Sequence, residues 1–159
     1  MRMLLLLGCL LASEPALAGP FDASPALLEV KVNDFIAQVP ELAKEAKPQD
    51  CRTVATMLVC TKIVDGFVIY AFGHETPPSI DHVVVGFWSK DQPTIKLGTI
   101  IALSIYDPAY IDDDGNKAQP VFDALSRVST DWIHLNGVNA KYTIELIDKR
   151  PTLLIEPRK

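Results

Sequence analysis

From Met57 to Gly73 the sequence reads MLVCTKIVDGFVIYAFG, and this stretch determines the architecture expected for the whole chain. Two runs rich in β-branched and aromatic residues, Met57–Val64 and 67–73, flank the dipeptide Asp65-Gly66. Asp-Gly between two such runs is a strong signal for a tight β-hairpin, because its turn needs residues that tolerate a positive φ. The sequence therefore predicts two neighbouring antiparallel strands here.

Further strands are expected downstream of this hairpin. Thr76-Pro77-Pro78 interrupts the extended pattern, and residues 80–88 (IDHVVVGFW) then predict a third strand. After the turn signal Asn136-Gly137, residues 140–147 alternate apolar and polar side chains as a strand does. A turn at 148–151 is followed by a last strand over 152–155.

Helices are expected before and between these strands. Ser24-Pro25 is a helix-start signal, with serine as the N-cap and proline in the first turn. The helix would end at Pro40, a second short helix would cover 40–47, and another would begin at Pro120. The first helix should bury Leu28, Val32, Phe35, Ile36 and Val39, and the last Val121, Phe122, Leu125, Val128 and Trp132.

Residues 94–106 (TIKLGTIIALSIY) fit two structures. Their β-branched content favours a strand, whereas their length and the spacing of their apolar residues favour a buried helix, which we adopt. The element order is then α–β–β–β–α–α–β–β. Because strands and helices come in blocks, we expect a single α+β domain over 19–159, with a mainly antiparallel sheet of about five strands.

Residues 1–18 have the pattern of a signal peptide. Arg2 precedes an apolar run over 3–12, and Ala16-Leu17-Ala18 provides the small residues that signal peptidase accepts, so Gly19 should become the N-terminus. The run is too short to span a bilayer about 30 Å thick. We expect a periplasmic protein, with secretion as the alternative, or lipid anchoring through Cys9 in the lipobox-like segment 6–9.

Removal of Cys9 with the signal peptide leaves Cys51 and Cys60, which an exported protein is expected to join as a disulfide. Nine steps of extended strand would separate their Cα atoms by roughly 30 Å, and nine steps of helix by about 13 Å. A disulfide needs Cα atoms less than about 7 Å apart. The chain must therefore reverse between them, most simply at 53–56.

Composition and charge exclude some functions. Hydrophobic residues make up 48% of the chain and charged residues 22%, which is typical of a globular protein. The net charge is −5, and lysines and arginines are scattered, which argues against nucleic acid or an anionic membrane as partner. We expect no membrane span and no cofactor.

Two groups of polar residues are candidate sites. Asp112-Asp113-Asp114-Gly115 resembles part of a calcium loop, but with Gly115 at position six the first and twelfth positions are Tyr110 and Val121, which cannot serve as ligands. His74-Glu75 lies just past one predicted strand and Asp81-His82 just inside the next, so these residues could meet as an acid–base pair. Because no nucleophile or ligand pattern accompanies either group, we assign no catalytic or metal-binding residue.

The central strands are apolar on both faces, since Phe67, Ile69 and Ala71 oppose Val68, Tyr70 and Phe72. A sheet with one wet face alternates apolar and polar residues instead. Either helices cover both faces, or one face meets a partner. In the second case Trp88, Tyr70 and Phe72 are the expected partner surface, because aromatic residues carry much of the energy of protein interfaces.

These observations lead to three functional hypotheses. The first is a non-catalytic exported binding protein that acts through another envelope or secreted protein, as an inhibitor, immunity or assembly factor does. The second is a carrier that holds a small apolar ligand between sheet and helices. The third is a hydrolase-like enzyme that uses His74 or His82 as its acid–base group.

Overall fold

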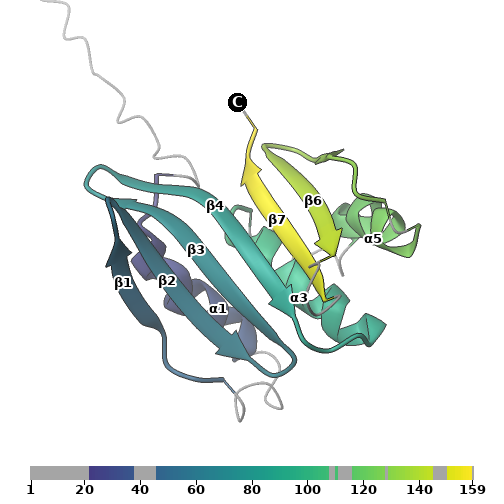
Figure 1. Ribbon diagram of the computed structural model, residues 1–159, viewed down its shortest axis with the longest axis horizontal. Coiled ribbons are helices and arrows are strands. Elements are labelled where there is room, and N and C mark those ends of the chain that lie inside the picture. The colour runs from purple at the N-terminus through teal and green to yellow at the C-terminus, as the bar shows by residue number, and fades with distance from the viewer. Residues whose placement is uncertain are drawn as a thin grey trace, which may run out of the picture.

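The computed structural model describes residues 22–37, 46–107, 110, 116–127, 129–144 and 150–158. Over these residues the chain forms one antiparallel sheet of seven strands in the order β1-β2-β3-β4-β7-β6-β5, with helices packed against it (Figure 1). The strands are β1 (Asp50–Val54), β2 (Met57–Val64), β3 (Phe67–Glu75), β4 (Pro78–Phe87), β5 (Ile133–His134), β6 (Val138–Ile144) and β7 (Pro151–Pro157). The expected α+β class with an antiparallel sheet is confirmed.

The hairpin predicted at Asp65-Gly66 joins β2 to β3, and Val64 lies directly opposite Phe67. Gly66 has φ +81°, a conformation that other residues adopt only with strain. At the far end of β3 a bulge lies between Phe72 and Gly73. A Cβ atom on Gly73 would lie 1.9 Å from the carbonyl oxygen of Ser79, so the close approach of β3 and β4 requires glycine there.

The prediction of about five strands was too low, and the order of elements differs accordingly. The sequence did not indicate β1 or β5. All five residues of β1 are exposed and mostly polar, so this edge strand lacks an apolar pattern and owes its form to pairing with β2. Strand β5 has two residues, too few for a periodic pattern. The expected reversal between the cysteines is confirmed, because Val54 pairs with Met57 across a turn at Ala55-Thr56.

The helices are η1 (Pro25–Leu27), α1 (Leu28–Ile36), α3 (Gln92–Ser104), η2 (Asn116–Ala118) and α5 (Gln119–Ser126). In Figure 1, α1 and α3 lie behind the sheet, and α5 lies beside β6. The segments η1 and α1 contact the β2–β4 half, α3 contacts β3, β4 and β7, and α5 contacts β5 and β6. The described helices therefore cover one face of the sheet and leave the other uncovered.

The ambiguous segment 94–106 is helical as far as Ser104, as predicted, and 105–106 form a turn. Asp91 caps α3 by accepting a hydrogen bond from the backbone N–H of Thr94 at 2.8 Å, and Pro93 fits the first turn. The helix lies close to the sheet at Gly98, where an added Cβ would be 2.6 Å from a ring carbon of Phe87. This contact places α3 over the centre of the sheet.

The core lies between the helices and the sheet. The side chains that β3, β4 and β7 turn toward the helices are buried, as are those of α1 that the sequence pattern predicted. They include Leu28, Val32, Phe35, Ile36, Phe67, Ile69, Ala71, Val83, Val85, Phe87, Leu153 and Ile155.

The prediction that Trp132 lies on the inner face of the last helix was wrong. Helix α5 ends at Ser126, and Trp132 precedes β5 with 39% of its surface exposed. Several expectations fall outside the described residues: the signal peptide with Cys9, Val39 and most of the short helix over 40–47, the aspartates at 112–114, and Val128. No helix among the described residues is long and apolar enough to cross a membrane.

Candidate functional site

We call the sheet surface turned away from the described helices the open face. On every central strand the residues that alternate with the buried ones point to it. Pairing across the sheet aligns Thr61, Tyr70, Val84 and Leu154 into one row, which ends at Lys141. The middle of the open face is therefore apolar and uncharged, and its charged groups lie toward its margins.

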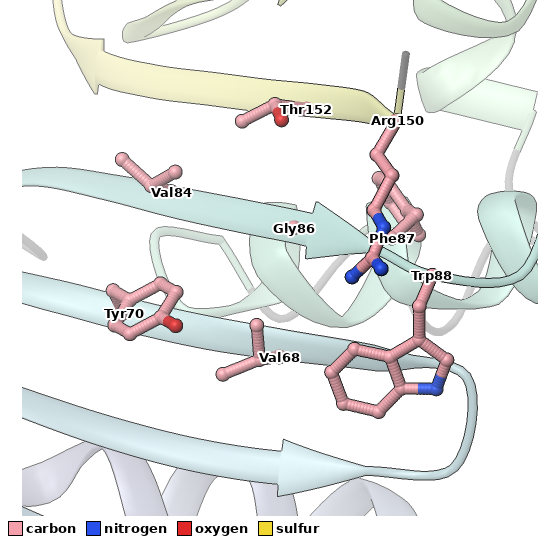
Figure 2. Close-up of a pocket in the computed structure, with 8 residues that line it drawn as sticks. All are labelled: Val68, Tyr70, Val84, Gly86, Phe87, Trp88, Arg150 and Thr152. Atoms are coloured by element: carbon pink, nitrogen blue, oxygen red, sulfur yellow. The ribbon is translucent and has the colours of Figure 1, made fainter. Parts of the chain in front are cut away.

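A hollow of about 230 Å³ lies on this face above Gly86, where the absence of a side chain leaves the strand bare (Figure 2). Tyr70 and Val68 border it from β3, and Val84 and Trp88 from β4 and the residue after it. A Cβ on Gly86 would meet only one atom, Cγ1 of Val68, at 3.4 Å. The hollow is thus an open depression in the sheet surface that a side chain at position 86 would fill.

Trp88 forms one wall of the hollow and is 44% exposed. Its backbone N–H, like that of Ser89, donates to the carbonyl oxygen of Gly66 at 3.1 Å, which fixes the end of β4 against the β2–β3 turn. In Figure 2 the guanidinium of Arg150 extends from the start of β7 toward the indole. An aromatic ring and a cation therefore stand together at this end of the open face.

The other two residues of the expected partner surface, Tyr70 and Phe72, also point to the open face and are half-buried. Their rings lie 6.3 Å apart between centroids, and Phe72 stacks on His82 at 4.4 Å. The structure thus brings Trp88, Tyr70 and Phe72 to one surface.

Sequence analysis missed Trp132 and Lys141 as members of this surface. The ammonium of Lys141 lies 5.6 Å from the centre of the Trp132 ring, a cation–π distance. Lys141 points to the open face because Ala140 and Tyr142, its neighbours on β6, are buried beneath the helices. The pairing of β6 with β7 determines that Lys141 points to the open face. The amino-acid pattern of residues 132–141 alone does not predict it.

Charge is distributed unevenly along the open face. Arg150 lies at the end where β4 finishes and β7 begins. At the opposite end Asp81 and Glu156 line a second hollow, together with Asn139. An apolar centre therefore lies between an acidic and a basic end.

The two histidines do not form a catalytic arrangement with their neighbours. Nε2 of His74 lies 3.5 Å from Oδ2 of Asp81, so the predicted meeting of the two strand ends occurs. The hydroxyl of Ser79 donates to Oδ1 of the same aspartate at 3.1 Å. Asp81 therefore stands between the serine and the histidine, whereas activation of a serine requires the histidine to touch it. No group of three or more acidic, histidine or cysteine side chains that could hold a metal occurs within the described residues.

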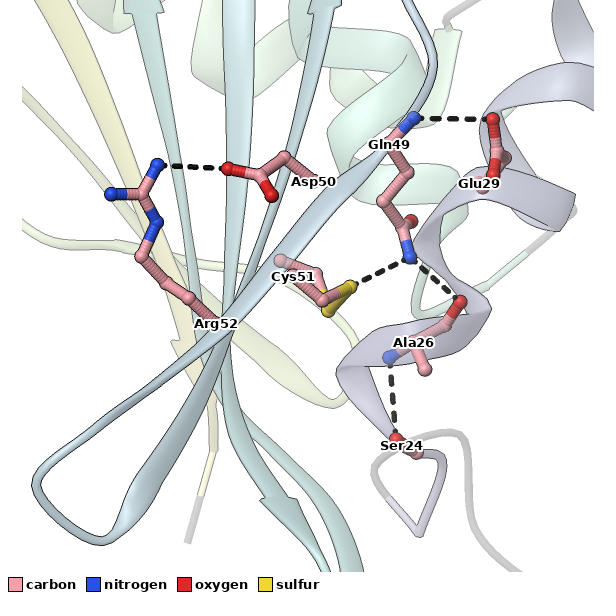
Figure 3. The surroundings of a disulfide bond; sticks show 8 residues. Ser24, Ala26, Glu29, Gln49, Asp50, Cys51 and Arg52 are labelled. Carbon is pink, nitrogen blue, oxygen red and sulfur yellow. Dashed lines mark hydrogen bonds and ion pairs between the residues drawn. A yellow bond between two sulfur atoms is a disulfide. The ribbon is translucent and has the colours of Figure 1, made fainter.

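The disulfide anchors the edge of the sheet. Cys51 and Cys60 are bonded and lie directly opposite each other on β1 and β2, which confirms the predicted pairing. The side-chain amide of Gln49 donates to the sulfur of Cys51 and to the carbonyl oxygen of Ala26 (Figure 3). The start of β1 is thereby tied to η1.

An ion pair between a buried lysine and a partly exposed glutamate lies under this edge. Lys62, whose side chain is 3% exposed, donates to Oε1 of Glu29 at 3.0 Å. The same oxygen accepts from the backbone N–H of Gln49 at 3.2 Å. Both hydrogen bonds favour the carboxylate, first that from Lys62, and they lower the pKa of Glu29 below its ordinary value of 4.5.

A third hollow, of about 400 Å³, lies between α1 and β2 and is lined in part by Glu29 and Lys62. Ala37 and Ala46 also line it, and the residues between them, 38–45, lie outside the described part of the chain. We assign this hollow no role.

Comparisons of the chain with protein-family models, with curated proteins and with solved structures found no match. Functional inference therefore rests on the geometry of the open face.

Proposed function

We propose that this chain is a non-catalytic binding protein, exported to the periplasm, that acts by binding another protein through its open face. The observation that carries the proposal is the one-sided placement of the described helices, which leaves a sheet surface with Tyr70, Phe72 and Trp88 on it. A contiguous apolar patch with a polar rim is typical of a protein interface.

The size and shape of the hollow over Gly86 support a protein partner rather than a small ligand. Pockets that enclose a drug-sized ligand measure about 300–1,000 Å³ and bury most of its surface. The hollow is smaller, at about 230 Å³, and lies open on the sheet surface. It suits a single side chain presented by a larger surface.

Site-specific photocrosslinking tests this function. A benzoylphenylalanine at Thr152, which lines the hollow, should yield an adduct with another protein when the producing cells are irradiated. The matched control is the same amino acid at Val30, an apolar residue of α1 that is 55% exposed and lies in the helix layer. Mass spectrometry then identifies the crosslinked protein.

Binding is then measured with the identified protein in purified form. Trp88→Ala should weaken the complex by about 2 kcal/mol or more, as loss of an aromatic anchor does. Val30→Ala should leave the affinity unchanged. Equal crosslinking at Thr152 and Val30, or no adduct at Thr152, would contradict a binding role for the open face.

A further inference from the structure

We propose that the open face packs against the open face of a second copy of this chain. A two-fold axis would lie between the two sheets. It would run at right angles to the strands and pass over the paired residues Val85 and Leu153 of each copy. This inference rests on the proposed function, because it uses the same surface. It identifies the bound protein as a second copy of the chain. Three features of the face are complementary under this one operation.

The first feature is shape. A two-fold axis at Val85 reverses β4 upon itself, so Val84 of each copy comes to lie over Gly86 of the other. The isopropyl group of Val84 then enters the hollow that Gly86 leaves. Because the interface is isologous, this contact between an apolar side chain and a hollow occurs twice.

The second feature is charge. Val85 is paired with Leu153, so the same axis reverses β7 about Leu153. Arg150 and Glu156 are each three residues from Leu153, and each therefore meets the other in the second copy. Arg150 already interacts within its own chain, and the five N–H donors of a guanidinium allow it a second acceptor. A two-fold axis along β7, which would make the facing strands run in the same direction, would place Arg150 over Arg150.

The third feature is the aromatic residues. Trp88 and His82 are each three residues from Val85, so the exposed indole comes to lie over the stacked rings of Phe72 and His82 in the second copy. The second copy thereby covers Trp88, the exposed aromatic residue that follows β4. Tryptophan is among the residues that most often act as energetic anchors of an interface.

The size of the face is close to the lower limit for a specific interface, which fits a weak dimer. Strands β2, β3, β4, β7 and β6 lie about 4.8 Å apart and rise about 3.3 Å per residue, so seven residues on each give a surface of roughly 550 Å² before side-chain relief is counted. Specific interfaces bury at least about 600 Å² on each partner. Two twisted sheets can pack face to face at a distance of about 10 Å, as in a β-sandwich.

Sedimentation equilibrium of the exported protein, after processing by a bacterial host, tests the inference. The average mass should rise above that of one chain, toward that of two, as the concentration is raised to about 1 mM, the dissociation constant of a very weak complex. Added salt should weaken the association, because part of it is electrostatic. The probe is the protein itself, so no unidentified ligand is needed.

Charge exchange provides the specific test. Arg150→Glu should raise the dissociation constant of the dimer by roughly tenfold or more, because it places two carboxylates together on each side of the axis. The double variant Arg150→Glu/Glu156→Arg restores opposite charges between copies and should return the constant to within roughly threefold of the parent. Arg127→Glu, at an exposed position in the helix layer, is the matched control and should have no effect.

Gly86→Val tests the hollow. The added side chain has room in the single chain, since its Cβ meets only Val68 at 3.4 Å, but it occupies the space that Val84 of the second copy needs. The variant should remain folded by urea denaturation and lose the dimer.

Either of two results would overturn the inference: one-chain mass at every concentration, or a dimer that withstands both Arg150→Glu and Gly86→Val. The first would leave the proposed function to be judged by crosslinking at Thr152. An adduct at Thr152 whose mass differs from that of two chains would identify another partner. Absence of any adduct would contradict the proposed function itself.

Discussion

Phe87 and Trp88 are consecutive aromatic residues whose side chains lie in different environments. Phe87 is 1% exposed and its ring lies beside Phe67 and beneath Gly98 of α3, whereas Trp88 is 44% exposed at the rim of the open face. The alternation of a strand explains the difference, because neighbouring side chains point to opposite faces. The energetic roles of the two residues should therefore differ as well.

Truncation of each aromatic residue measures this difference. Trp88→Ala should cost less than about 1 kcal/mol of unfolding free energy, as changes at exposed positions do. Phe87→Ala should cost about 3–5 kcal/mol, because it removes a buried ring and leaves a cavity. Urea denaturation of both variants is the measurement. A loss of several kcal/mol for Trp88→Ala would place this side chain in the core and remove it from the proposed interface.

Gly98 of α3 and Gly86 of β4 differ in the same way, because Gly98 faces the core and Gly86 faces the open surface of the sheet. Alanine normally stabilises a helix interior relative to glycine by about 1 kcal/mol. At Gly98 the added methyl group would lie 2.6 Å from the ring of Phe87 and 3.2 Å from that of Phe67. Gly98→Ala should therefore destabilise the fold, by about 1–3 kcal/mol, since overpacking outweighs helix propensity.

Gly86→Ala is the control for this prediction, because its added Cβ would have ordinary contact distance to Val68. It should leave the free energy of unfolding unchanged or raise it slightly, since glycine weakens a strand interior. Urea midpoints of the two variants decide the matter. A Gly98→Ala variant more stable than the parent would show that α3 moves away from the sheet easily.

At the scale of elements, the sequence predicted those parts whose signal is local. Asp65-Gly66 specifies its own turn, and Ser24-Pro25 specifies the start of η1, where the serine hydroxyl accepts from the N–H of Ala26 at 3.2 Å. Strand β1 lacks such a signal, because its form depends on β2 and on the disulfide. The position of Trp132 likewise depends on a neighbouring strand, through the pairing of β5 with β6. The local sequence pattern therefore predicted a helix there wrongly.

The ion pair between α1 and β2 makes the stability of the fold depend on pH. Because the pKa of Glu29 is lower in the folded chain than its ordinary 4.5, the folded state binds fewer protons there than the unfolded state. The pair's contribution is therefore complete above pH 4.5 and is lost as the pH falls through the folded value. The ammonium of Lys62, at 3% exposure, then remains without its counter-charge.

Glu29→Gln tests this dependence. At pH 7 the variant should be less stable than the parent, because it leaves the buried Lys62 charge unpaired. The difference should shrink as the pH is lowered toward 2, since the parent then loses the same carboxylate charge. Lys62→Met is the matched variant and should cost less at pH 7, because Glu29 is partly exposed and methionine fills the space of the lysine stem. Urea midpoints at several pH values are the measurement, and a pH-independent difference for Glu29→Gln would contradict the assignment.

At the scale of the whole molecule, the open face is a consequence of where the helices dock. The strands β3 and β4 carry apolar side chains on both sides, so their sequence is compatible with helices on either face or on both. The choice depends on contacts between segments distant in the chain, such as Gly98 against Phe67 and Phe87. Sequence analysis could therefore name Tyr70, Phe72 and Trp88 as surface candidates but had no means to decide whether they are covered.

Substitution of two cross-strand pairs on β4 and β7 tests directly whether helices cover only one face of the sheet. Val85 and Leu153 are paired across the strands and fully buried beneath the helices, whereas the adjacent pair, Val84 and Leu154, points to the open face. Val85→Thr/Leu153→Thr should cost at least about 3 kcal/mol, because each threonine buries a hydroxyl among apolar side chains at about 1–3 kcal/mol and also removes apolar packing. Val84→Thr/Leu154→Thr keeps the β-propensity of the strands and should cost at most about 1 kcal/mol, since water reaches the new hydroxyls. Both are measured by urea denaturation at low micromolar concentration, where a weak dimer contributes little. Equal losses for the two pairs would mean that the open face is covered within the single chain, and the proposals built on it would then fail together.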